Sequence, residues 1–146
     1  MTVLAIDPAY SKAYAYALFS GEKLVFAGKD EYLGTIVNIL HKWRPDIVVT
    51  EDMYLGKNVD TLKKLCYAVG KIMYVCEQME VPYRLISPKG WTLHHGLRGI
   101  KNRDMRKQLE DKIIETVSGE VPRDPDIRSA ILIGMCHIEQ ARMGVK

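Results

Sequence analysis

Residues 3–7 read VLAID, so four apolar residues run directly into an aspartate, and Pro8 follows. A second stretch of the same design, DIVVTED at residues 46–52, ends in Glu51 and Asp52. Short apolar runs of this kind are typical of strands that are buried on both faces. If the two strands are parallel neighbours, their carboxyl ends meet at one edge of a sheet. Asp7 and Glu51 are then expected to lie close together.

The order of the remaining elements predicts an α/β fold, with a mixed five-stranded sheet and helices on both faces. Residues 13–28 alternate, break at Ser20-Gly21 and resume, which is a hairpin signal. The first strand should be antiparallel to its hairpin partner and parallel to the strand at 46–51. The other predicted elements are a helix capped by Asp30 and ending at Trp43, a helix at 60–79, a strand at 83–87, a basic loop, a helix at 103–117 and a last helix at 124–143.

Length and composition narrow the class of protein. A chain of 146 residues with 47% hydrophobic and 27% charged residues is expected to form one domain, residues 1–146. No apolar run reaches the roughly 18 residues that a membrane span requires, and no signal peptide precedes the first strand. The three cysteines, Cys66, Cys76 and Cys136, have no C-x-x-C spacing. They predict reduced core thiols in a reducing compartment such as the cytoplasm.

Charge is distributed unevenly along the chain. Residues 1–60 hold 6 basic and 8 acidic residues, whereas residues 61–146 hold 15 basic and 10 acidic ones. Six of the basic residues and one acid fall within KGWTLHHGLRGIKNRDMRK at 89–107. On charge alone, a solvated surface and a nucleic-acid contact explain this segment equally well.

The acids at the two strand ends predict a metal site. Neighbouring carboxylates repel and raise each other's pKa unless a cation lies between them. Mg²⁺ prefers oxygen ligands of this kind. The last helix adds acids to the set, because Asp124 has the position of an N-cap and Asp126 that of the first turn. Capping and the helix dipole explain those two acids as well as a metal does.

Four blocks of the sequence resemble the RuvC-type Holliday junction resolvases of the RNase H-like nuclease superfamily. They are AIDPAYSKAYAYAL at 5–18, VTEDMYLGKNVDTLKKLCYAVGKI at 49–72, LISPKGW at 85–91 with GIKNRDMRKQL at 99–109, and RDPDIRSAILIGMCH at 123–137. The blocks follow the family's order and cover nearly the whole chain. The resemblance implies a Mg²⁺-dependent endodeoxyribonuclease, with Mn²⁺ as an alternative ion, that cuts paired strands of four-way DNA junctions as a homodimer.

The resemblance also implies roles for individual residues. The metal ligands would be Asp7, Glu51 and Asp126, completed by Ser129 or Asp124, and Lys89 and Lys101 would act as catalytic residues near the scissile phosphate. Tyr54 corresponds to an aromatic residue that contacts bases at the junction centre. The predicted DNA-binding residues are Tyr54, Lys57, Asn58, Lys89, Arg98, Lys101, Arg103 and Arg106.

The helix at 60–79 corresponds to the one that dimerises in this family. Leu65, Val69, Ile72 and others form an apolar stripe at helical spacing, and Tyr67, Ala68 and Val75 extend the apolar surface beyond it. A helix that is apolar over more than one face is expected to have a second partner, which predicts a two-fold interface here.

Ser129 departs from the family pattern, because the second acid of the last helix usually stands at this position. This departure keeps open a non-catalytic or weakly catalytic junction-binding protein of the same fold. Another RNase H-like nuclease is the remaining alternative. An RNA–DNA hybrid nuclease needs a glutamate on the first helix, where only Glu31 stands at its start, and a proofreading exonuclease needs an acid where Ala9 stands.

Overall fold

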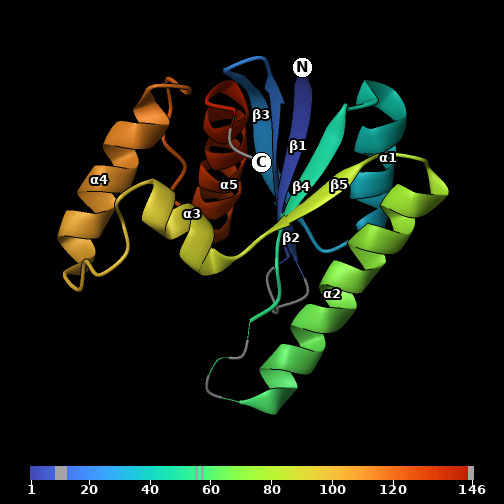
Figure 1. The fold of residues 1–146 in the computed structure, drawn as a ribbon, viewed down its shortest axis with the longest axis horizontal. Coiled ribbons are helices and arrows are strands. Elements are labelled where there is room, and N and C mark those ends of the chain that lie inside the picture. Colours follow the sequence, from blue (N-terminus) through green and yellow to red (C-terminus); the bar gives the residue numbers. More distant parts are fainter. Residues whose placement is uncertain (9–12, 55, 57, 145–146) are drawn as a thin grey trace.

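The computed structural model describes residues 1–8, 13–54, 56 and 58–144, so the expectations for Ala9 and Lys57 lie outside the described residues. Five strands form one sheet in the order β3-β2-β1-β4-β5 (Figure 1). The strands are β1 (Thr2–Pro8), β2 (Tyr14–Ser20), β3 (Lys23–Asp30), β4 (Ile47–Glu51) and β5 (Tyr83–Ile86). β1 is antiparallel to β2 and parallel to β4, which confirms the predicted mixed sheet. Gly21, at the predicted hairpin break, has a φ of 61°.

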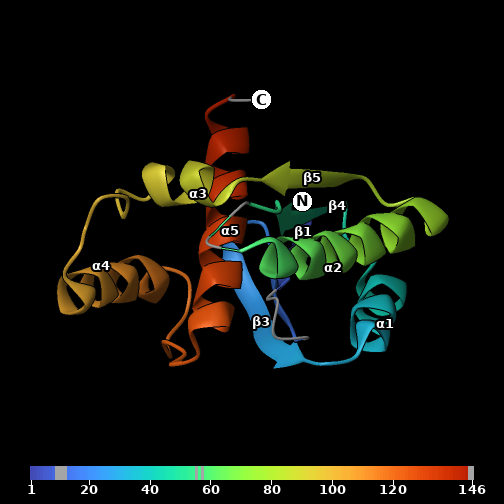
Figure 2. The ribbon, with the colours of Figure 1, turned by 90° about the horizontal axis from the view of Figure 1, so that it is seen from below.

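Helices cover both faces of this sheet. α1 (Leu33–Trp43) and α2 (Val59–Gln78) lie on one side, and α3 (Pro88–His94), α4 (Arg103–Glu115) and α5 (Pro125–Arg142) lie on the other (Figures 1 and 2). β1 is central and its side chains alternate between the two layers. Val3 and Ala5 belong to the core beneath α5, whereas Leu4 and Ile6 belong to the core beneath α1 and α2. The apolar run before Asp7 therefore serves two cores at once.

A glycine lets α5 pack closely against the sheet. A Cβ at Gly134 would overlap the ring of Phe19 on β2 and would come within 3.1 Å of the Ala5 side chain on β1. The neighbours of Gly134 along the helix, including Ile131, Leu132 and Ile133, are fully buried. The missing side chain therefore sets how near the helix axis lies to the strands.

Two local predictions are wrong. Asp30 does not cap α1, because Tyr32 holds the N-cap position and makes no side-chain capping bond. Asp30 accepts hydrogen bonds from the Tyr32 N–H and the Thr35 hydroxyl instead, and so shapes the turn before the helix. The predicted basic loop contains α3, which Ser87 caps through the N–H of Gly90. Within the described part of the chain, no helix has the length and apolarity needed to cross a membrane.

Candidate active site

Three carboxylates from three elements line one surface cleft. Asp7 is the penultimate residue of β1 and Glu51 ends the parallel neighbour β4. Asp126 is the second residue of α5, which packs across β1. The cleft has a volume of about 580 Å³, and Ser129, Tyr54, Trp91 and Arg106 are also among its lining residues. The sheet edge thus brings together the acids that the strand pattern predicts.

Burial and mutual repulsion hold the Asp7 carboxyl in its neutral form. Desolvation, the neighbouring charges of Glu51 and Asp126, and a smaller effect of Asp124 raise the pKa of Asp7 to about 8, against an opposing effect of Lys29. No hydrogen bond or ion pair reaches its side chain among the described residues. A buried acid that is neutral without a cation and charged with one has the chemistry expected of a metal ligand.

Glu51 is held in place by an indole. The Trp91 Nε1–H donates to Glu51 Oε2 over 2.6 Å, from α3 to the end of β4. Burial raises the pKa of Glu51, and this hydrogen bond opposes that rise. The bond occupies one carboxylate oxygen and fixes the direction of the other. Trp91 is only 4% exposed and packs in the core, but its N–H contacts the site.

Asp124 and Ser129, the two other candidate metal ligands, differ in whether they line the cleft. Asp124 caps α5 by accepting from the N–H groups of Asp126 and Ile127, and it does not line the cleft. Burial opposes the ionisation of Asp124, but those N–H bonds and Lys29 together lower its pKa. Ser129 lines the cleft one turn after Asp126. The position that faces the cleft therefore carries a hydroxyl, and the nearby carboxylate is engaged in capping.

Lys29 is a site residue that the sequence pattern did not identify. Its Nζ lies 2.6 Å from Asp126 Oδ2 and 3.3 Å from Asp124 Oδ2. The hydrogen bond to Asp126 raises the pKa of the Lys29 ammonium, which burial opposes. Lys29 lies near the end of β3, remote in sequence from the acids of the cleft. Only the pairing of β3 beside β2, with α5 laid across both, could have revealed it.

The comparisons with known proteins agree on one group. No known family profile matches the chain. The crossover junction endodeoxyribonuclease RuvC of Chloroflexus aurantiacus is 26% identical over 99 residues, which are 68% of this chain and 59% of that protein. Thermus thermophilus RuvC, solved in complex with a Holliday junction substrate, superposes with a TM-score of 0.79 over 99% of this chain and 97% of that one, at 18% identity.

The chain is similar to the RuvC proteins in sequence and in fold. The Fowlpox virus resolvase, solved with Holliday junction DNA, shares the RuvC-like fold more distantly, with a TM-score of 0.61 and 17% identity over 97% of this chain and 99% of that one. These structural likenesses confirm the RNase H-like fold that the sequence resemblance implies. The chain matches about three-fifths of the length of the curated RuvC relatives (59% in the first).

The donor set of this acidic cleft fits a hard divalent cation. All three acids offer carboxylate oxygens, which Mg²⁺ and Mn²⁺ prefer. The three carboxylates do not converge on a single point, since among the described residues only His94, His95 and Glu139 bring three ligand-type atoms within 4.8 Å of one another. Repulsion among the acids, and the pull of Lys29 on Asp126, account for the wider spacing.

A basic hollow of about 440 Å³ adjoins the acidic cleft of the RuvC fold and shares Arg106 and Ser129 with it. Arg103, Lys107 and Arg123 also line it. Hence two of the predicted DNA contacts, Arg103 and Arg106, line the hollow beside the acids. Arg123 was not predicted, because it precedes α5 and lies outside the basic segment of the sequence.

The other predicted DNA contacts are more scattered. Tyr54 is 44% exposed and lines the cleft with the acids. Lys89, Arg98 and Lys101 are exposed on α3 and on the segment that leads to α4, and none of them lines either hollow. Asn58 caps α2 through the Thr61 N–H, and Lys57 lies outside the described residues. The DNA roles of all these residues stay predictions.

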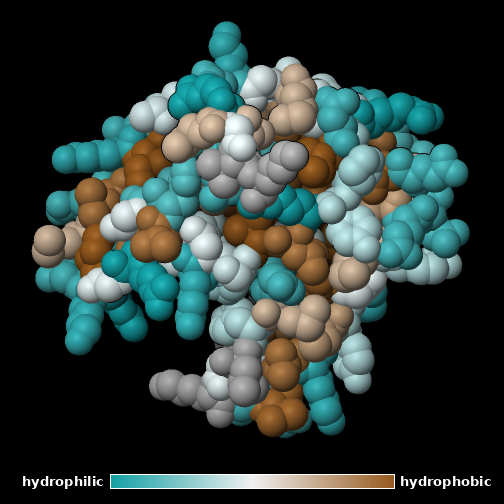
Figure 3. All heavy atoms as spheres, in the orientation of Figure 1, coloured by the Kyte–Doolittle hydropathy of each residue, from teal (hydrophilic) through white to brown (hydrophobic). Residues whose placement is uncertain are grey.

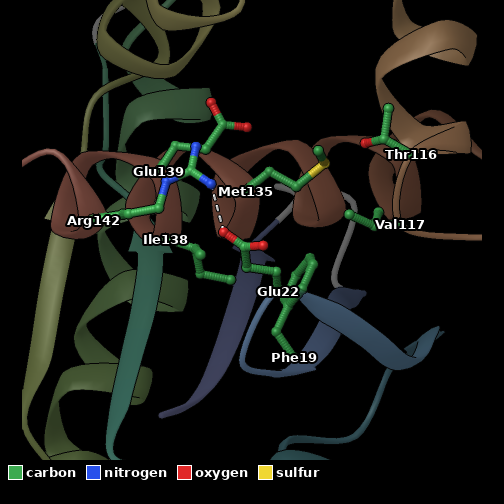
Figure 4. A pocket seen from close by; sticks show the side chains of 8 residues that line it. All are labelled: Phe19, Glu22, Thr116, Val117, Met135, Ile138, Glu139 and Arg142. Atoms are coloured by element: carbon green, nitrogen blue, oxygen red, sulfur yellow. Dashed lines mark hydrogen bonds and ion pairs between the residues drawn. The ribbon is translucent and has the colours of Figure 1, made fainter.

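The far end of α5 carries charges that are paired within the fold. His94 Nε2 lies 2.7 Å from a Glu139 carboxylate oxygen, and His95 Nε2 lies 2.7 Å from the Leu132 carbonyl oxygen. These contacts attach α3 to α5. A hollow of about 220 Å³ opens on the same half of α5, where Arg142 pairs with Glu22 over 2.6 Å (Figure 4). No predicted site residue lines that hollow.

Proposed function

We propose that this chain is a metal-dependent endonuclease that resolves four-way DNA junctions, working as a single nuclease domain. The observation that carries the proposal is the acidic cleft of Asp7, Glu51 and Asp126, placed at the edge of a RuvC-type sheet and continued by a basic hollow. The RuvC relatives are named crossover junction endodeoxyribonucleases, and two related folds were solved with Holliday junctions. A DNA-containing, reducing compartment suits this activity and the three free cysteines.

The chain's own groups divide the work in this proposal. Asp7, Glu51 and Asp126 would hold Mg²⁺, or Mn²⁺ in its place, with the Ser129 hydroxyl beside them. When bound there, the ion would supply positive charge that activates water for attack on a phosphodiester and offsets the charge that develops on the phosphate. Trp91 directs the Glu51 carboxylate. Arg103 and Arg106 would hold the phosphates beyond the scissile one, with Lys89 and Lys101 as further basic contacts.

A cleavage assay with matched variants tests the proposal. Glu51→Gln keeps the shape of the side chain and removes the charge, so cleavage of a labelled four-way junction should fall by roughly 100-fold or more while binding is retained. The matched control is Asp52→Asn, because Asp52 is adjacent, is bonded to the Met53 N–H and does not line the cleft. The readout is the rate of junction cutting in Mg²⁺ or Mn²⁺, with a hybrid duplex and single strands as competing substrates.

The same assay separates the rival functions. Tight binding of junctions without cutting at any metal concentration would favour a non-catalytic junction-binding protein, for which the hydroxyl at Ser129 is the supporting observation. Preferential cutting of the hybrid duplex would favour a different RNase H-like nuclease. Equal rates for wild type and Glu51→Gln would refute the acidic cleft as the site.

We also propose that α2 forms a two-fold interface, so that two clefts can act on one symmetric junction. Hydrophobic side chains are exposed toward the lower end of α2 in Figure 3. Tyr67 and Tyr74 are 66% and 62% exposed, and with Gly70 and Lys71 they line a hollow of about 490 Å³. Ala68 and Val75 pack partly buried against the core instead, so the available face differs from the one the sequence suggested.

Gly70→Arg is the variant that tests this interface. A Cβ at Gly70 would meet no atom within 4 Å and the position is exposed, so the protomer should fold, while the added charge blocks a helix partner. We expect a monomer by sedimentation and loss of paired cutting. The control is Gln78→Arg, which adds the same charge at an exposed position of the same helix outside the hollow. A wild-type monomer at micromolar concentration that still makes paired cuts would exclude the preformed dimer.

A further inference from the structure

The Lys29 ammonium reaches the acidic cluster from β3, a strand that supplies none of the predicted metal ligands. β3 is an edge strand, and Lys29 pairs in register with Ala15 of β2. Its side chain is 27% exposed and ends at the N-terminus of α5, between the carboxylates of Asp126 and Asp124. The positive charge of Lys29 also partly opposes the rise in the pKa of Asp7. One cation thus bears on three of the acids.

The charge of the cleft is suited to a single divalent ion. Asp7, Glu51, Asp126 and the adjoining Asp124 carry four negative charges when ionised. Lys29, which lies between Asp126 and Asp124, offsets one of them and leaves a formal −3. Ser129, one turn after Asp126, adds no charge where a further carboxylate would support a second ion. Two divalent ions would leave the cleft with an excess of positive charge.

We propose that Lys29 is a resident cation in the place of a second metal ion, so that the cleft works with one divalent ion. This inference rests on the proposed nuclease function. The ion would be held on the side of Asp7 and Glu51, and the Lys29 ammonium supplies the positive charge beside Asp126. An ammonium carries three N–H donors and can bind a phosphate oxygen as it gains negative charge. Its role is electrostatic, and no proton transfer is assigned to it.

A purely structural role for Lys29 predicts different behaviour. The ion pairs join the edge strand β3 to α5, so their loss would lower stability without changing how many ions bind. The resident-cation role instead links two readouts of opposite sign. Removing the ammonium should weaken catalysis and strengthen metal binding, because the acids lose the positive charge that competes with the metal.

Calorimetric titration with Mn²⁺, together with junction cleavage, tests the inference. Wild type should bind one ion per chain. Lys29→Met keeps the length of the stem, and it should bind Mn²⁺ at least several-fold more tightly or take up a second ion, while cleavage falls on the order of 100-fold. Lys29→Arg should keep one ion and most of the activity. Lys23→Met, at the exposed start of the same strand, is the matched control.

The double variant Lys29→Met/Ser129→Asp sharpens the test. It exchanges the cation for a further carboxylate, so it should bind two ions and regain cleavage relative to Lys29→Met. Two ions bound to the wild type, or an Mn²⁺ titration that Lys29→Met leaves unchanged, would overturn the inference. If the wild type cuts no junction, the nuclease proposal fails, and the ion count still decides the role of Lys29.

Discussion

Arg128 on α5 and Asp7 on β1 are both buried ionisable side chains, and they differ in whether the fold pairs them. The Arg128 side chain is 5% exposed, and each of its three guanidinium nitrogens has a partner. Nε donates to Glu110, Nη1 lies 3.0 Å from the Pro122 carbonyl oxygen and 2.7 Å from an Asp111 oxygen, and Nη2 donates to the Lys107 carbonyl. Its partners belong to α4 and to the segment that joins α4 to α5.

The acidic cleft next to it is incomplete. Asp7 is 7% exposed, and its side chain receives no hydrogen bond or ion pair among the described residues. The fold supplies one N–H to Glu51 and one ammonium to Asp126. The contrast teaches how to separate structural from functional charges. Arg128 has a partner at every guanidinium nitrogen, as a structural charge requires, whereas burial leaves Asp7 and Glu51 with raised pKa values, as expected of functional acids.

The largest effect should come from breaking the complete cluster. Arg128→Met leaves Glu110 and two carbonyl groups without their buried donor, which should lower the free energy of unfolding by about 3–5 kcal/mol. Arg106→Met is the control, because Arg106 also pairs with Glu110 but its side chain is 38% exposed, so its loss should cost less than about 1 kcal/mol. Urea denaturation measures both. Equal losses for the two arginines would contradict the distinction.

In the acidic cleft, removing a charge should have the opposite effect on stability: Asp7→Asn should stabilise the fold at high pH. The folded-state pKa of Asp7, about 8, lies above the 3.8 of an unfolded aspartate. Its contribution to stability is therefore fully present below about pH 4 and is lost as the pH rises through about 8. In chelator, the wild type should lose on the order of 2 kcal/mol relative to Asp7→Asn across this range, since relaxation and water penetration reduce the full linkage value. Parallel pH–stability curves for the two proteins would show that folding does not raise the pKa of Asp7.

The smallest effect should come from the single bond that the fold gives to Glu51. Trp91→Phe removes the indole N–H, a change of about 1 kcal/mol, and the pKa of Glu51 should rise. Protons should then compete more strongly for the carboxylate, so Mn²⁺ affinity should fall more at pH 6 than at pH 8. Trp43→Phe, at a half-exposed ring on α1, should leave the titrations unchanged. A loss of affinity that is the same at both pH values would point to packing instead.

The sequence was sufficient for the parts of the site that local patterns determine. Two apolar runs ending in acids predicted the meeting of Asp7 and Glu51, and the Asp-Pro start predicted the cap and first turn of α5. Lys29 and Arg123 were missed because their relation to the acids depends on how β3, α4 and α5 pack. No periodicity in the chain records such a contact. Asp124 was ambiguous for the same reason, since capping and metal binding ask for the same residue type.

The geometry of the acidic cleft depends on Gly134, an uncharged residue in the core. It lies eight residues after Asp126, or about 12 Å along the helix axis, where α5 rests on Phe19 and Ala5. A methyl group at this position would push α5 away from the sheet, and its first turn, which carries Asp126, would shift relative to the ends of β1 and β4. The relative positions of the acids therefore depend on close packing in the core. A screen for inactive but folded variants should recover substitutions of this buried glycine as often as substitutions of the carboxylates.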